Sequence, residues 1–313
     1  MAKRRAPTWS RRHKQWLRYV EAWIGVFECG EKIPLGPAHS PLDCPDGRRS
    51  AGEVLNVVIC SPHPDDEGLI GGLPLRLRLE AGARVTNVAI TLGSKLDQRP
   101  RRLRELESSC RVLGFGLEVA EHPSGLENVN LKNRDSRPEE WRAKVETLAA
   151  LFDRFCPDVV FAPHAEDWNS THVGTHYLAV DALGLHLERS ARGPVPLILT
   201  EFWHELGQPN LMVGLRPEIV ATELMATAEH GGEVRRNPYH LRHPARLMNN
   251  VRRGSEVVGG QGGPAHRFPL AELYRVAFMR GRELQEPAPG GLVIGPKQKV
   301  SLESIVERFL VKP

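Results

Sequence analysis

Cysteine is scarce in the 313-residue sequence, and no two cysteines form a CxxC pair. The five that are present are scattered and odd in number: Cys29, Cys44, Cys60, Cys110 and Cys156. Such a set argues against a disulfide framework and is typical of proteins from a reducing cytoplasm. Also missing are an apolar run near the roughly 18 residues of a membrane span and the apolar core of a secretory signal. We therefore expect a cytoplasmic protein without a transmembrane segment.

Positive charge is concentrated at one end of the chain and is not in surplus elsewhere. The formal net charge is +4, but residues 1–20 hold seven Lys or Arg and no acid, which leaves −3 for the remainder. Without a basic face, the sequence gives no sign of a nucleic-acid binder. The whole chain is 41% hydrophobic and 26% charged, which is typical of a globular protein with a sizeable core.

The basic segment runs into a stripe of large apolar side chains at helical spacing. The stripe consists of Trp16, Tyr19, Val20, Trp23, Ile24 and Phe27. The spacing predicts a short helix that packs on the domain, and a helix lying on a membrane surface is the less favoured interpretation. Residues 31–52 are rich in Pro, Gly and Ser and indicate a linking loop. We thus expect an extension and linker over 1–52, a main domain over 53–290 and a C-terminal tail over 291–313.

From residue 54 the pattern alternates between short apolar runs and helical periodicity. We predict strands over 54–60, 84–93, 117–123, 158–164 and 195–203, and helices over 68–82, 100–114, 139–155 and 171–190. This alternation predicts an α/β fold of Rossmann-like type, a mainly parallel sheet with helices on both faces. After residue 205 the alternation stops. One more strand fits 209–215, and 217–285 read as a C-terminal region of helices and loops.

Two of the predicted strands end in clusters of histidine and acid. The first runs into "SPHPDDEG", which contains His63, Asp65 and Asp66, and the fourth into "APHAEDWNSTH", which contains His164 and His172. In open α/β sheets, ligands bind beyond the carboxyl ends of the strands. Charged groups at the end of a buried strand are costly unless they are paired or bind a metal. Two imidazoles and a carboxylate with an open fourth position are typical of a catalytic zinc site.

Each of these residues also has a purely structural interpretation. The acids after His63 are suited to capping the helix that follows, and His63 itself precedes a proline and suits a turn. His172 and His176 are four residues apart, so either both bind the metal or one of them lies a turn further along the helix. Because both strand ends carry His and Asp, the two together favour the metal site.

The motif "PHPDDE" resembles the signature of the LmbE/PIG-L-like deacetylases. These are zinc enzymes that remove N-acetyl groups from glucosamine-containing substrates, and the resemblance extends over about residues 54–285. A second motif of that family usually reads His-Pro-Asp-His at the start of a helix. In this sequence Asn169, Ser170, Thr171 and His172 stand in its four places.

The resemblance implies a role for each residue that matches a family motif. His63, Asp66 and His172 match the zinc ligands, one ion per chain, and Asp65 matches the general base. A substrate contact is implied for Arg102, and we expect substrate contacts also from His164, His176 and His230. His230 lies in a segment similar to a later His-containing motif. Asn169 replaces the first histidine of the second motif and can donate to the oxyanion but cannot act as an acid. Proton transfer to the product then falls to His164, to His176 or to Asp65 itself.

The resulting prediction is a zinc-dependent hydrolase that removes an N-acetyl group from an amino sugar or a small glycoconjugate containing one. Two alternatives remain open: an amidase of a related amide such as a thiol conjugate, and a non-catalytic binding module on the same fold. Asp65 disfavours the binding module, because a protein that only binds has no need of a general base. The sequence leaves homo-oligomerisation open.

Overall fold

The computed structural model describes residues 11–36 and 54–311, and the chain divides into two compact units, residues 1–35 and 36–313. The first unit contains helix α1 (Arg11–Gly30), as the apolar stripe predicts. Within α1, Tyr19 makes edge-to-face ring contacts with Trp16 and Trp23 at 5.9 and 6.5 Å between ring centroids. The surface that this stripe meets stays a prediction. The basic residues 1–10 and most of the expected linker lie outside the described residues.

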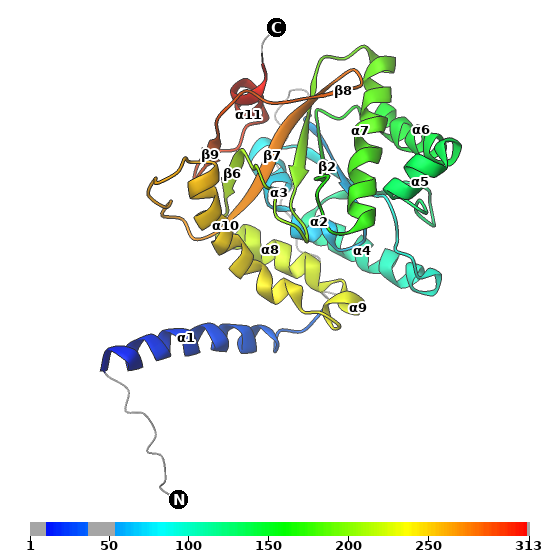
Figure 1. The fold of residues 1–313 in the computed structure, drawn as a ribbon. Helices are drawn as coiled ribbons and strands as arrows, with labels where there is room; N and C mark the ends of the chain where they lie inside the picture. Colours follow the sequence, from blue (N-terminus) through cyan, green and yellow to red (C-terminus); the bar gives the residue numbers. More distant parts are fainter. Residues whose placement is uncertain (1–10, 37–53, 312–313) are drawn as a thin grey trace, which may run out of the picture. The chain divides into compact units, whose positions relative to one another are not determined.

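The second unit is built on a mixed, mostly parallel sheet, which confirms the predicted α/β class (Figure 1). Its described strands are β1 (Asn56–Ser61), β2 (Arg84–Ala89), β3 (Gly116–Val119), β4 (Val159–Pro163), β5 (Val195–Thr200), β6 (Leu211–Gly214), β7 (Ala271–Arg280), β8 (Glu283–Gln285) and β9 (Leu292–Ile294). They are ordered β3-β2-β1-β4-β5-β7-β6-β9, and β8 pairs with β7. The five strands from β3 to β5 are parallel, whereas β7 is antiparallel to both of its neighbours in this order.

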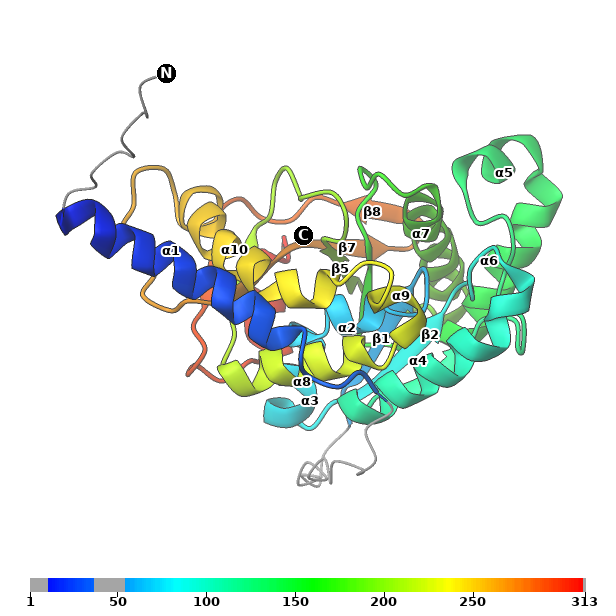
Figure 2. The same ribbon diagram turned by 90° about the horizontal axis from the view of Figure 1, so that it is seen from below.

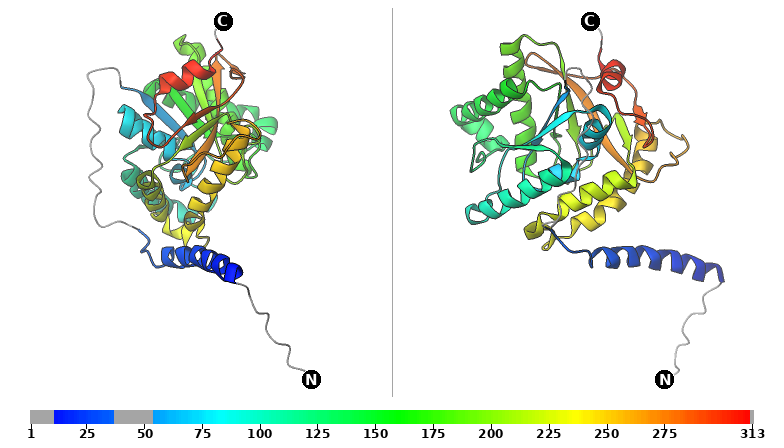
Figure 3. Two further views of the ribbon diagram at one scale, coloured as in Figure 1. Left: turned by 90° about the vertical axis from the view of Figure 1, so that its left-hand side faces the viewer. Right: turned by 180° about the vertical axis from the view of Figure 1, so that it is seen from behind.

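Helices cover both faces of the sheet (Figures 1 and 3). They are α2 (Asp66–Leu69), α3 (Gly72–Ala81), α4 (Arg99–Leu113), α5 (Leu131–Ser136), α6 (Pro138–Phe155), α7 (Ser170–Ser190), α8 (Pro217–Ala228), α9 (Gly231–Val234), α10 (His243–Val257) and α11 (Leu302–Phe309), with 3-10 turns η1 (Leu96–Gln98) and η2 (Tyr239–Arg242). On one face α6 and α7 bury Phe152 and Leu183 in one apolar cluster. On the other face α3, α4 and α8, which lie together in Figure 2, contribute to a second cluster.

Within residues 11–36 and 54–311, no helix is long and apolar enough to span a membrane.

Three features differ from the sequence-based prediction. The expected helix over 68–82 is divided into α2 and α3, although it ends at Gly82 in the left-handed conformation that favours glycine. The prediction of helices and loops over 217–285 is wrong for β7 and β8, and β7 lies inside the sheet between β5 and β6. Residues 291–313, expected to be a tail, contain β9 and α11, and Phe309 of α11 is fully buried in the core.

The sheet brings the carboxyl ends of β1 and β4 together. β1 pairs in parallel with β2 on one side and with β4 on the other, so the strand order changes direction at β1. The residues that follow β1 and β4 therefore meet at the topological switch point, where open α/β sheets bind their ligands.

Candidate active site

Two histidines and an aspartate converge at this switch point. His63 follows β1, Asp66 begins α2, and His172 lies in the first turn of α7. His63 Nδ1 and His172 Nε2 are 3.2 Å apart, and each lies 3.4 Å from Asp66 Oδ2. One donor atom from each residue lies within 4.8 Å of the others, so the three could hold a metal ion.

The second nitrogen of His172 faces another carboxylate. His172 Nδ1 lies 3.5 Å from Asp167 Oδ1, and the side chain of His172 is fully buried. Asp167 is held in place because it accepts hydrogen bonds from the backbone N–H groups of Asn169, Trp203 and His204. A carboxylate in this position orients a metal-binding imidazole and fixes its tautomer. The arrangement turns Nε2 of His172 toward His63 and Asp66.

The electrostatics of these residues favour a cation. Burial alone would lower the pKa of His172, but the carboxylates of Asp66 and Asp167 outweigh burial and raise it to about 10. Burial would raise the pKa of Asp66, but His172 and His63 hold it well below its usual range. The attraction that favours a proton on His172 would equally favour a metal ion in the proton's place. The donor set therefore fits a divalent ion.

Asp65 points away from the imidazoles, although it precedes Asp66 in the chain. Its backbone is left-handed, with φ 114°, which is uncommon outside glycine. The carboxylate accepts a hydrogen bond from the phenol of Tyr239, and its Oδ1 lies 3.8 Å from the guanidinium of Arg102. Burial and the charge of Asp66 raise the pKa of Asp65 to about 7. A carboxylate with such a pKa can take up and release a proton near neutral pH.

Glu67 stabilises the turn that contains Asp65. It is fully buried, and its Oε2 accepts a hydrogen bond from the backbone N–H of Asp65 at 3.0 Å. Its Oε1 accepts from Ser109 and from His230 Nε2, the latter at 2.7 Å. His230 is 1% exposed, and although burial alone would lower its pKa, Glu67 raises it. Glu67 thus links His230 to the backbone of Asp65, while the substrate contact expected for His230 stays a prediction.

The other sequence candidates lie at different parts of the site. Arg102 reaches the turn, where it also donates a hydrogen bond to the carbonyl of Pro64 at 3.0 Å. His164 and His176 bond to the backbone carbonyls of His204 and Pro163, at 3.0 and 2.9 Å, and neither belongs to the donor set that contains His172.

Asn169 is the N-cap of α7. Its Oδ1 accepts a hydrogen bond from the backbone N–H of Thr171 at 2.8 Å. The capping hydrogen bond uses the side-chain oxygen of Asn169, so its amide N–H₂ group remains available to donate a hydrogen bond to a substrate.

The two side chains that contact the Asp65 carboxylate each line a cleft, Arg102 one and Tyr239 the other. One, of about 630 Å³, is lined by polar and charged side chains that include Arg101, Arg102 and Arg236. The other, of about 380 Å³, is lined by Phe202, Trp203 and Tyr239 together with polar and charged side chains. Tyr239 carries no motif and was missed at the sequence level, as was the anchoring role of Glu67. Asp167 lies in the same segment as the second motif, shortly before Asn169, so its spacing from His172 could have suggested it.

Residues 58–183 match the family model PIG-L, described as GlcNAc-PI de-N-acetylase. The resemblance inferred from the motifs is thereby confirmed for this part of the chain. A search among curated proteins finds no match to the sequence.

Solved structures share the fold at low sequence identity. A conserved protein from Thermus thermophilus is 21% identical, with 71% of this chain and 94% of that chain covered and a TM-score of 0.52. GalB, the 4-carboxy-2-hydroxymuconate hydratase from Pseudomonas putida, is 16% identical, with coverages of 72% and 98% and a TM-score of 0.51. The zinc-inhibited form of a teicoplanin deacetylase is 17% identical, with coverages of 72% and 98% and a TM-score of 0.50. A hydratase and a deacetylase share this fold, so the reaction must be argued from the site.

Proposed function

Because residues 58–183 match the PIG-L family model, we propose that this protein is a zinc-dependent amide hydrolase that removes an N-acetyl group from an amino sugar or a glycoconjugate containing one. One observation carries the proposal: His63, Asp66 and His172 converge, while the neighbouring Asp65 points elsewhere. A site that only bound a metal would have no use for a second, separately held carboxylate. The teicoplanin deacetylase that has this fold adds support for the reaction class.

The atoms that would hold the zinc ion are His63 Nδ1, Asp66 Oδ2 and His172 Nε2, since these face one another. When bound, zinc supplies a positive charge that makes water more acidic and polarises an amide carbonyl. Asp167 keeps His172 in the orientation that this binding needs.

Asp65 is the residue we assign to proton transfer. Its carboxylate takes a proton from the water that attacks the acetyl carbonyl carbon. As the bond between carbonyl carbon and nitrogen breaks, Asp65 returns the proton to the nitrogen, so that acetate and a free amine leave. The phenol of Tyr239 and the guanidinium of Arg102, each of which lines one cleft, hold the carboxylate in position. The amide N–H₂ of Asn169 is the donor we assign to the developing oxyanion.

The clefts lined by Arg102 and by Tyr239 suit a polar substrate with a ring. Arg101, Arg102 and Arg236 offer donors to hydroxyl or anionic groups on one side. On the other side Trp203 and Tyr239 pack edge-to-face, with ring centroids 5.8 Å apart, and offer an apolar surface with a polar edge. A sugar carrying a larger aglycone would use both clefts.

An assay of acetate and free-amine release tests the reaction class. Protein equilibrated with zinc and then desalted, so that its sites are filled and no free zinc remains, would be given a panel of N-acetylated sugars, glycoconjugates and a thiol-conjugate amide. We expect hydrolysis of at least one N-acetylated sugar. Activity on the thiol-conjugate amide alone would move the protein to the alternative amidase class, and no hydrolysis of any amide would contradict the proposal.

Replacement of Asp65 tests the mechanism. Asp65→Asn should keep its metal and its fold but lose activity by about 10²-fold or more, as expected for loss of a general base. Asp135→Asn is the matched control, because Asp135 is an exposed residue of α5. Near-wild-type turnover by Asp65→Asn would remove this residue from the mechanism.

A further inference from the structure

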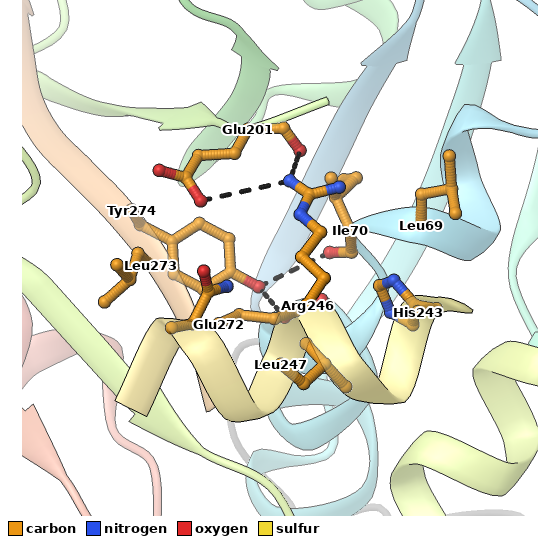
Figure 4. A pocket seen from close by; sticks show the side chains of 10 residues that line it. Leu69, Ile70, Glu201, His243, Arg246, Leu247, Glu272, Leu273 and Tyr274 are labelled. Atoms are coloured by element: carbon orange, nitrogen blue, oxygen red, sulfur yellow. Dashed lines mark hydrogen bonds and ion pairs between the residues drawn. The ribbon is translucent and has the colours of Figure 1, made fainter. Parts of the chain in front are cut away.

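A second cluster of buried side chains that could bind a metal lies outside the active site. Glu223 comes from α8, His243 begins α10, and Glu272 lies on β7. Their exposed fractions are 0%, 4% and 4%. One donor atom from each lies within 4.8 Å of the other two, and His243 Nε2 is 3.9 Å from Glu223 Oε2. Figure 4 shows His243 at the end of its helix and Glu272 beside Tyr274.

Most of the polar atoms of this cluster lack a hydrogen-bond partner. Among the described residues, no hydrogen bond of regular geometry reaches either oxygen of Glu223, either ring nitrogen of His243 or Oε1 of Glu272. The two carboxyl groups interact with each other and with the backbone of Gly72, but none of these contacts involves His243. Only Oε2 of Glu272 is satisfied, by the phenol of Tyr274 and the backbone N–H of Leu73. Buried polar atoms without partners are rare in native proteins, and each points to an unseen water, ion or proton.

Arg246 lowers the pKa of Glu223 and Glu272 through its charge, but its guanidinium makes its direct contacts with another acid. Arg246 donates a hydrogen bond to the carbonyl of Glu201 at 2.6 Å and lies 3.9 Å from its carboxylate. Burial raises the pKa of Glu223 and Glu272, and for Glu223 the proximity of Glu272 adds to the effect. Two buried carboxylates close together need a positive charge or a proton to stay in the fold.

A proton does not explain the whole cluster. One proton shared between Glu223 and Glu272 would relieve their repulsion but would leave both nitrogens of His243 without a partner. A divalent cation accepts an electron pair from all three residues, and two carboxylates with a neutral imidazole balance its charge. A cavity of about 10 Å³, lined by His243 and Glu272 among others, leaves room for a single small species (Figure 4).

We propose that Glu223, His243 and Glu272 bind a structural divalent cation of the type that accepts oxygen and nitrogen ligands, such as Zn²⁺ or Mn²⁺. This ion is additional to the one in the active site. It ties α8, α10 and β7 together, three elements that are distant in the sequence. His243 directly follows η2, which carries Tyr239, and Leu69 and Ile70 at the end of α2 line the same cavity. The ion thus stabilises η2 and the end of α2, the two segments next to Asp65 and its partner Tyr239. This stabilisation does not depend on which reaction the site performs.

Metal analysis in a background without the active-site ligands tests this site. The double variant His63→Ala/His172→Ala is equilibrated with Zn²⁺ or Mn²⁺, desalted, and its ions per chain are measured by plasma mass spectrometry. We expect one retained ion. Adding Glu223→Gln should remove it, whereas adding Glu218→Gln, an exposed acid on the same helix, should leave it in place. A folded double variant that retains no ion overturns the proposal, and so does an ion that survives Glu223→Gln.

Thermal unfolding separates a metal ion from a shared proton. With an ion, Glu223→Gln lowers the melting temperature and abolishes the rise that added Zn²⁺ or Mn²⁺ causes in its parent. With a shared proton, Glu223→Gln keeps a hydrogen bond to Glu272, so its melting temperature stays at or above that of its parent, which overturns the proposal. If Glu223→Gln does not fold, His243→Gln takes its place. This variant should also lose the retained ion, and retention of the ion would overturn the proposal.

Discussion

The phenol of Tyr239 donates a hydrogen bond to Asp65 Oδ2 across 174 residues of sequence. Tyr239 lies in η2, outside the segment that matches the family model, and Asp65 lies in the turn between β1 and α2. The carboxylate proposed as the base is therefore oriented by the C-terminal region of the domain. This region contributes to the site although it lacks a recognisable motif.

Tyr239→Phe should reduce activity while it preserves metal content. The variant loses a hydrogen bond to a charged group, which is worth about 1.5–3 kcal/mol and corresponds to roughly a 10- to 100-fold loss of kcat if the bond matters in the transition state. Steady-state kinetics and metal analysis on the same preparation would measure both effects. Unchanged kcat would mean that Tyr239 only fills space beside Asp65.

His172 and His176 offer a direct test of the register of the second motif. His172→Ala should lose one ion per chain relative to wild type, because its Nε2 faces His63 and Asp66. His176→Ala should keep the full metal content, because Nδ1 of His176 is bonded to the carbonyl of Pro163. Plasma mass spectrometry of both variants would show which of the two histidines is a metal ligand. Full metal in His172→Ala together with loss in His176→Ala would show that the register is wrong.

The alternating pattern made most of the parallel half of the sheet predictable. Strands buried on both faces read as continuous apolar runs, and Gly82 and Gly114 ended the helices before β2 and β3 as glycine usually does. Because parallel strands end at the same edge of a sheet, the approach of His63 to His172 also followed from the sequence.

What could not be predicted depends on contacts between distant segments. β7 is buried along nearly its whole length, so it lacks the alternation that identifies an antiparallel strand with one solvated face. Tyr239 and Glu223 belong to segments without a motif, and only the tertiary fold places one beside Asp65 and the other beside Glu272. His230 was noticed from its motif, but its buried partner Glu67 could not be identified from spacing.

Asn169 has two roles that substitutions can separate. As the N-cap of α7 it uses its side-chain oxygen, and its loss in Asn169→Ala should cost about 1 kcal/mol of stability. As the proposed oxyanion donor it uses its N–H₂ group, and loss of such a donor costs about 2.7–4 kcal/mol in the transition state. Asn169→Asp keeps the cap but not the donor, so it should restore the melting temperature and leave kcat low. If Asn169→Asp recovers both the melting temperature and kcat, Asn169 acts only as an N-cap. Asn169→His should remain active, because an imidazole N–H can also donate to the oxyanion.

The buried imidazole of His176 should make stability depend on pH below neutrality. Burial lowers the pKa of His176 below the ordinary value of 6.5, so the folded state holds the ring neutral while the unfolded state takes up a proton. Its contribution to stability is therefore complete above that ordinary value and is lost as the pH falls below it, by up to about 1.4 kcal/mol per pH unit. His176→Asn can keep a hydrogen bond to Pro163 without titrating, so its unfolding free energy should fall less steeply between roughly pH 6.5 and pH 5. Denaturant titrations of both proteins would give the two slopes, which should be parallel above roughly pH 7.5. Equal slopes over the acidic range would show that His176 takes up its proton without unfolding.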